Sequence, residues 1–149
     1  MVYIARQMLH ARLWYNHLWK GMIILKLDYD LIRDLLIKTE EMTDGVSGYV
    51  FNNYCLSFKD VERIKLRYHL KYLYNIGFIE SLSKCNSANI ERLAIIDITP
   101  AGREYLDNIR NISVWHKTKS IIHKFGSPVT VSMVSNIAAS VVKHSLGLG

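Results

Sequence analysis

Apolar side chains recur every three or four positions in several parts of this chain, and this spacing predicts helices. Within residues 58–80, Leu66, Leu70 and Leu73 share one side of such a helix. Basic side chains lie largely off that stripe, at Arg63, Lys65, Arg67 and Lys71. A helix of this kind packs its apolar side on a core and can offer its other side to an anion. Gly77 follows as a helix stop, because glycine tolerates the left-handed conformation.

The same spacing predicts four further helices around this one. Asp28 is a suitable N-cap for a helix over residues 28–41, and Thr99 followed by Pro100 starts another that runs to about Arg110. A third begins at Ser113, and a last one follows the break at residues 126–128 and closes near Gly147. Their inward faces are expected to carry Ile32, Leu35, Leu36 and Thr39; Tyr105, Leu106 and Ile109; Trp115, Thr118, Ile122 and Phe125; and Val131, Val134, Ile137, Ala138, Val141 and Val142.

Strand patterns interrupt the helices at three places. Residues 78–84 and 91–98 are apolar or β-branched and are separated by turn-forming residues 85–89, which predicts a β-hairpin directly after the basic helix. A short strand is expected at residues 49–51, and a short helix at residues 59–64. The predicted fold class is therefore α+β, mainly helical with a small β-hairpin.

Three segments are expected along the chain: residues 1–25, a domain over 26–112, and a C-terminal helical extension over 113–149. Residues 1–25 have two interpretations. They are a leader that arises from an upstream start codon, or an extra helix that packs on the domain or on a second copy through Trp14, Tyr15 and Trp19.

The order helix, short helix, basic helix, hairpin and helix is that of a winged helix-turn-helix. Residues 67–73 with 77–79 resemble the recognition helix and following strand of arsenical-resistance-type and multiple-antibiotic-resistance-type repressors. Residues 97–104 resemble the strand-to-helix junction after the wing of these repressors. The chain departs from them in one respect, since only residues 59–64 are available for the first helix of the turn motif.

Residues from about 26 onward are similar to a group of phage and prophage proteins that form a domain of unknown function. The matching pieces are residues 26–33, 68–70, the Thr99-x-x-Gly102 junction, 106–110 and 114–115. The resemblance implies a winged-helix fold with extra C-terminal helices and a setting in the cytoplasm of a bacterial host. It implies no activity.

Charge is unevenly distributed along the chain, whose formal net charge is +6. Residues 108–149 hold five Lys or Arg residues and no Asp or Glu, whereas all thirteen acidic residues lie between positions 26 and 107. The central domain is thus basic only around residues 58–71. Apolar runs are too short or too often interrupted by charge for a membrane span.

A winged-helix fold would place the basic helix in the major groove of DNA and the hairpin tip against the backbone. The candidate DNA-binding residues are Lys59, Arg63, Lys65, Arg67, Tyr68, Lys71, Lys84, Asn86, Asn89 and Arg92. The expected function is that of a transcriptional regulator that binds double-stranded DNA as a homodimer, with the C-terminal helices as dimer contacts. The alternative is a phage interaction module that binds or inhibits a host protein.

Catalytic and metal chemistry are not expected. Asp28, Asp30 and Asp34 are better explained as helix-start residues than as an acid–base cluster. Cys55 and Cys85 lack the paired spacing of metal ligands and are expected to be reduced thiols, so neither a cofactor nor a metal is predicted. His69 is expected to be a partly buried helix residue with one ring nitrogen bonded locally.

Overall fold

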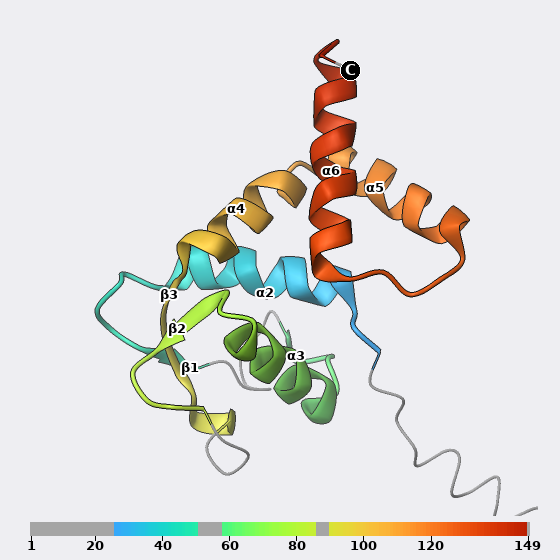
Figure 1. Ribbon diagram of the computed structural model, residues 1–149. Coiled ribbons are helices and arrows are strands. Elements are labelled where there is room, and N and C mark those ends of the chain that lie inside the picture. Colours follow the sequence, from blue (N-terminus) through green and yellow to red (C-terminus); the bar gives the residue numbers. More distant parts are fainter. Residues whose placement is uncertain (1–25, 51–57, 86–89, 149) are drawn as a thin grey trace, which may run out of the picture.

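The computed structural model describes residues 26–50, 58–85 and 90–148 (Figure 1). The described elements confirm the predicted α+β class, mainly helical with a small antiparallel sheet of three strands. They are, in order, α2 (Tyr29–Met42), β1 (Tyr49–Val50), α3 (Arg63–Asn75), β2 (Ile79–Ser81), the 3-10 helix η2 (Ile90–Arg92), β3 (Ala94–Ile98), α4 (Pro100–Ile109), α5 (Ile112–Phe125) and α6 (Val131–Ser145).

Side-chain caps define the starts of four of these helices. The carboxylate of Asp28 accepts the N–H of Leu31, and the hydroxyl of Thr99 accepts the N–H of Gly102, as predicted. Asn111 caps α5 and Thr130 caps α6 in the same way. Each cap satisfies a backbone donor that has no partner inside its helix.

The three strands lie in the order β1-β3-β2, and both neighbouring pairs are antiparallel. The β2–β3 pair is the predicted hairpin, and it contains a bulge between Glu80 and Ser81. The short strand expected at residues 49–51 is present as Tyr49–Val50 and adds a third strand on the other edge of β3. Residue 51 lies outside the described residues.

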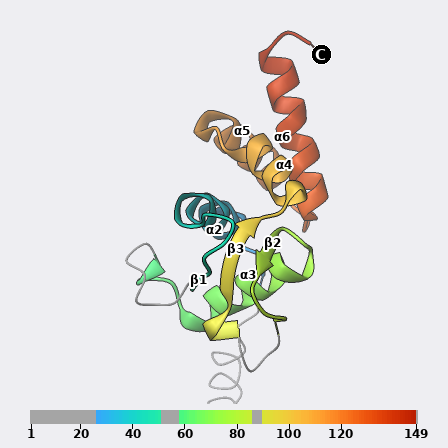
Figure 2. The same ribbon diagram turned by 90° about the vertical axis from the view of Figure 1, so that its left-hand side faces the viewer.

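Helices α2 and α4 separate the two ends of the molecule (Figures 1 and 2). The sheet and α3 lie on one side of them, and α5 and α6 lie on the other. One apolar core joins these layers, with Leu35, Leu106 and Trp115 among its fully buried members. The large buried area makes this core the main source of stability, because burial contributes roughly 25 cal/mol per Å² of apolar surface.

A close approach between α4 and the turn into β2 explains one glycine. A side chain at Gly102 would place its Cβ 2.3 Å from the backbone oxygen of Phe78, well inside van der Waals contact. The N–H of Thr99 donates to that same oxygen at 3.0 Å. The Thr99-x-x-Gly102 junction therefore lets α4 start directly against the hairpin.

Several expected elements differ from the structure. Residues 59–62 form a turn and a bend rather than the expected short helix, and Arg63 and Ile64 already belong to α3. Both hairpin strands are shorter than expected, because β2 already ends at Ser81 and η2 replaces the first part of the second strand. Phe125 was expected inside but is 60 % exposed, since it lies in the last turn of α5, beyond the reach of the core.

Candidate functional site

The outer face of α3 is the candidate DNA-binding surface. Leu66, His69, Leu70 and Leu73 are buried, so the opposite side of the helix is turned away from the core. Arg67 and Lys71 are four residues apart and therefore share that side, where Lys71 is exposed and Arg67 is half-buried. Ile64 is 52 % exposed on the same side, a feature that the basic pattern alone does not indicate.

A cluster of three residues, the Asp28 cluster (Asp28, Lys65 and His69), attaches α3 to the start of α2. The Nζ atom of Lys65 lies 2.5 Å from Oδ2 of Asp28. The backbone N–H of Asp28 donates to Nε2 of His69 at 2.8 Å. Asp28 thus caps its own helix with one oxygen, pairs with Lys65 through the other, and contacts His69 through its backbone.

These partners determine the protonation state of His69. A backbone N–H can only donate, so Nε2 must accept and carries no proton. The proton of the neutral ring then lies on Nδ1, which is 2.8 Å from the carbonyl oxygen of Lys65 and donates to it. His69 is fully buried, and this burial lowers its pKa, against a smaller opposing effect of the Lys65 carbonyl. A neutral imidazole is therefore built into the contact between α2 and α3.

The same surroundings keep the carboxylate of Asp28 charged. Burial raises its pKa, but the hydrogen bonds from Lys65 and from the N–H of Leu31, together with the positive charge of Lys65, lower the pKa overall. Asp28 is therefore charged when His69 is neutral. The ammonium group of Lys65 is paired with this carboxylate, on the flank of α3.

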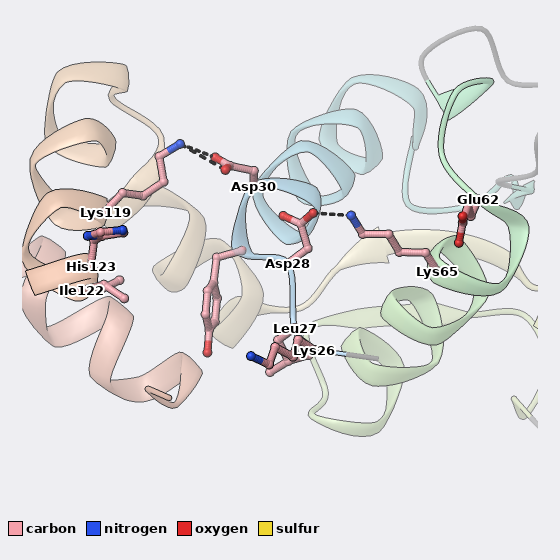
Figure 3. A pocket seen from close by; sticks show the side chains of 10 residues that line it. Lys26, Leu27, Asp28, Asp30, Glu62, Lys65, Lys119, Ile122 and His123 are labelled. Carbon is pink, nitrogen blue, oxygen red and sulfur yellow. Dashed lines mark hydrogen bonds and ion pairs between the residues drawn. The ribbon is translucent and has the colours of Figure 1, made fainter. Parts of the chain in front are cut away.

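A cleft of about 620 Å³ opens beside the Asp28 cluster, between the starts of α2 and α3 and one side of α5 (Figure 3). Two ion pairs border it: Lys65 with Asp28 on the α3 side, and Lys119 with Asp30 on the α5 side. Asp30 also accepts the indole N–H of Trp115 at 2.7 Å. The first turn of α2 is thereby tied both to α3 and to α5.

The lining of this cleft carries charges of both signs. Its described residues are Lys26, Leu27, Asp28, Tyr29, Asp30, Glu62, Lys65, Lys119, Ile122 and His123. Figure 3 shows the ammonium group of Lys65 pointing to Asp28 and that of Lys119 pointing to Asp30, and not into the open space. The cleft therefore lies where the start of α2 contacts α3 on one side and α5 on the other.

Asp28, Asp30 and Asp34, which we expected to be helix-start residues rather than an acid–base cluster, have a structural role at two of the three positions. Asp28 is a cap and Asp30 binds Trp115 and Lys119, as described above. Asp34 is exposed, its side chain at 59 % of full exposure, and its Oδ1 lies 3.5 Å from Arg33. Within residues 26–50, 58–85 and 90–148, no group of three or more His, Cys, Asp or Glu side chains is placed to hold a metal ion.

The remaining predicted contacts are spread over the turn and the hairpin. Lys59 is exposed in the turn before α3, and Arg63 is exposed in the first turn of that helix. Tyr68 is half-buried, with its ring edge-on to His69 at 5.3 Å between centroids. Lys84 follows β2 and Arg92 ends η2, both exposed, whereas Asn86 and Asn89 lie outside the described residues, as do Cys55 and residues 1–25.

Sequence reasoning missed the Asp28 cluster as a unit. It found the N-cap at Asp28 and a locally bonded ring nitrogen at His69, and both are confirmed. It did not find that the second nitrogen of His69 accepts the N–H of Asp28, 41 residues away, or that the ring is completely buried. The available signal was the spacing of Lys65 and His69, which places both on one flank of α3.

The fold and the site together define a small, mainly helical α+β protein with a basic helix held beside a three-stranded sheet. The chain belongs to the DUF2513 family, described as "Hypothetical protein (DUF2513)", which it matches over residues 26–128. It is also similar to an uncharacterized protein of Haemophilus influenzae, with 25% identity over 122 residues that cover 82% of this chain and 99% of that protein. No solved structure matches this chain. No helix in the part of the chain that the structure describes is long and apolar enough to cross a membrane.

Proposed function

We propose that this protein binds double-stranded DNA through a winged helix-turn-helix and regulates transcription in a phage or prophage setting. The observation that carries the proposal is the combination of element order and sheet order. Helix α2, strand β1, helix α3 and the β2–β3 hairpin follow one another, and β3 lies between β1 and β2. In a winged helix this arrangement presents the recognition helix next to the wing. Here a turn and a bend at residues 59–62 stand in the place of the first helix of the turn motif.

In this proposal α3 is the recognition helix. Arg67 and Lys71 are the side chains that would reach guanine edges or phosphates, with Tyr68 and Arg63 beside them. Lys65 has a different role, because its ammonium is held by Asp28 and orients α3 on α2. Lys59 would contact phosphate from the preceding turn.

The hairpin supplies the wing. Lys84 and Arg92 stand at its two sides and are exposed, which suits contacts to the adjacent phosphate backbone. Asn86 and Asn89 lie between them in the sequence, outside the described residues, and complete the proposed set. A wing of this kind adds affinity more than sequence specificity, because phosphates are the same along the duplex.

We include a homodimer in the proposal, since two copies would offer two α3 helices to neighbouring half-sites. Support comes from the end of α6, which projects away from the domain (Figure 1) and is followed by Leu146 and Leu148 at 67 % and 73 % exposure. Sedimentation analysis over a range of concentrations tests this stoichiometry, and a monomer throughout would contradict it.

The test of DNA binding is a fluorescence-anisotropy titration of a labelled random duplex at several salt concentrations. We expect affinity to fall steeply with salt, and the Arg67→Ala/Lys71→Ala double variant to bind at least about tenfold more weakly while remaining folded. The matched control, Lys117→Ala/Lys124→Ala, removes the same charge from α5 at the other side of the molecule. Equal weakening in both variants, or no salt dependence, would contradict docking through α3.

A second candidate function is supported by the other end of the fold: a module that binds a host protein. The specific observation is an apolar groove between α5 and α6, lined by Ile121, Ile137 and Val141. A pull-down from host lysate after nuclease treatment separates the two functions. A partner that is lost with nuclease supports DNA binding, and a protein retained through α5 and α6 supports the module.

A further inference from the structure

The groove between α5 and α6 has an apolar floor. It encloses about 610 Å³ and is lined by Ile121 from α5 and by Ile137 and Val141 from α6. Ile121 is 45 % exposed although it lies in the middle of a well-formed helix. The remaining lining is mostly of small polar side chains, at Ser120, Asn136, Ser140 and Ser145, which allow another backbone to come close.

The charge around this groove has one sign. Lys117 and His144 line it, and Lys124 lies one turn beyond Ile121 on α5. The sequence contains no Asp or Glu from position 108 onward, so neither helix supplies a carboxylate to these lysines. On the neighbouring helices α2 and α4, Asp30 pairs with Lys119 and Asp107 with Arg110.

We propose that this groove binds an acidic amphipathic helix of a partner protein. Apolar side chains of that helix, spaced three and four residues apart, would enter the groove over Ile121 and Ile137. Its carboxylates would face Lys117 and Lys124 at the rim, where opposite charges select the partner and accelerate association. The proposal goes beyond DNA binding, and it gives the second candidate function its surface.

Two other occupants suit the groove less well. A second copy placed groove to groove would bring the Lys117 rims together without a single carboxylate between them, and such like-charge contacts are unfavourable. A lipid surface needs apolar side chains that reach roughly 5–10 Å into the boundary between headgroups and acyl chains. Here the apolar side chains form the floor of a groove instead. The concave apolar floor and the acid-free rim together point to a helix with negative flanks.

The experiment uses the full chain and a fluorescein-labelled peptide of about five helical turns, with leucines at helical spacing and glutamates at the other positions. Fluorescence anisotropy should give saturable binding that weakens as salt is added. The same peptide with lysine in place of every glutamate should not bind. Ile121→Glu and Lys117→Glu should each reduce the affinity at least tenfold.

Ile112→Glu is the matched control for Ile121→Glu. The two isoleucines lie on the same helix with similar exposure, 55 % and 45 %, but nine residues apart and so on opposite sides of it. Ile112→Glu should leave peptide binding unchanged, and circular dichroism should show all variants folded. Arg67→Ala/Lys71→Ala should also leave it unchanged, which separates this result from the DNA titration.

Four results would overturn the proposal. They are the absence of saturable binding at peptide concentrations up to about 1 mM, equal binding of the lysine peptide, self-association that Ile121→Glu abolishes, and binding to phosphatidylglycerol vesicles that Ile121→Glu abolishes. The last two would assign the groove to a second copy or to lipid.

Discussion

His69 accepts the backbone N–H of Asp28 across 41 positions of sequence, at 2.8 Å, with its ring completely buried. This bond fixes the proton on the other ring nitrogen and joins the start of α2 to the middle of α3. We propose that α3 reads DNA, so the bond also helps to fix the orientation of this helix relative to α2. Several measurable consequences depend on it.

Replacing His69 with Ala should destabilise the fold by about 2–4 kcal/mol. The substitution leaves a cavity in the core and leaves the N–H of Asp28 without its acceptor. Urea unfolding followed by circular dichroism measures the change. His116→Ala, at an exposed position of α5, is the control and should change stability by less than about 0.5 kcal/mol. Equal effects would show that the buried bond contributes nothing.

Stability should decrease as pH falls from about 7.5 to 5.5. The pKa of His69 is lowered in the folded protein, so the unfolded chain, with a histidine pKa near 6.5, binds the proton more readily. The contribution of the neutral ring is therefore complete above pH 6.5 and is lost progressively below it, towards the folded pKa. Asp28 acts in a separate window, since its lowered pKa costs stability only as pH falls below about 4.

The measurement for this pH dependence is the free energy of unfolding at closely spaced pH values. His69→Gln provides the comparison, because glutamine does not titrate. The slope between pH 7.5 and 5.5 should be smaller in His69→Gln than in the unaltered protein. Identical slopes would mean that His69 becomes protonated without cost.

The Lys65–Asp28 ion pair should contribute modestly to stability and little to DNA affinity. A double-mutant cycle with Lys65→Met and Asp28→Asn should give a coupling energy of about 0.5–1 kcal/mol, because both side chains remain partly exposed and solvent screens them. Lys65→Met should change DNA affinity by less than about threefold, in contrast to the Arg67→Ala/Lys71→Ala variant. A loss as large as in that variant would make Lys65 a DNA contact.

Gly102→Ala should destabilise the protein by about 1–3 kcal/mol. The added Cβ would stand 2.3 Å from the backbone oxygen of Phe78, so α4 or the hairpin has to shift. Thermal unfolding measures the effect, and Glu104→Ala, exposed on the same helix, serves as the control. If Gly102→Ala unfolds at the same temperature as the unaltered protein, the close approach carries no strain.

Local patterns were sufficient to predict most of the secondary structure. The apolar spacing predicted α2, α3, α4, α5 and α6, and the caps at Asp28 and Thr99 marked two of their starts. These features depend on residues within a few positions of one another, so the sequence states them directly. The expected helix at 59–64 failed for a related reason, since a six-residue pattern is too short to outweigh the contacts of its neighbours.

Local sequence patterns alone predict the helices α2 to α6, the hairpin after the basic helix and the uneven distribution of charge. Tertiary structure alone decided that β1 pairs with β3, that Lys65 is held by Asp28, and that the apolar residues of α5 and α6 leave a groove between them. The first two join segments far apart in the chain, and the third depends on how two consecutive helices pack on each other. The spacing of apolar residues indicates which side of an element is buried, but it does not indicate which other segment packs against that side.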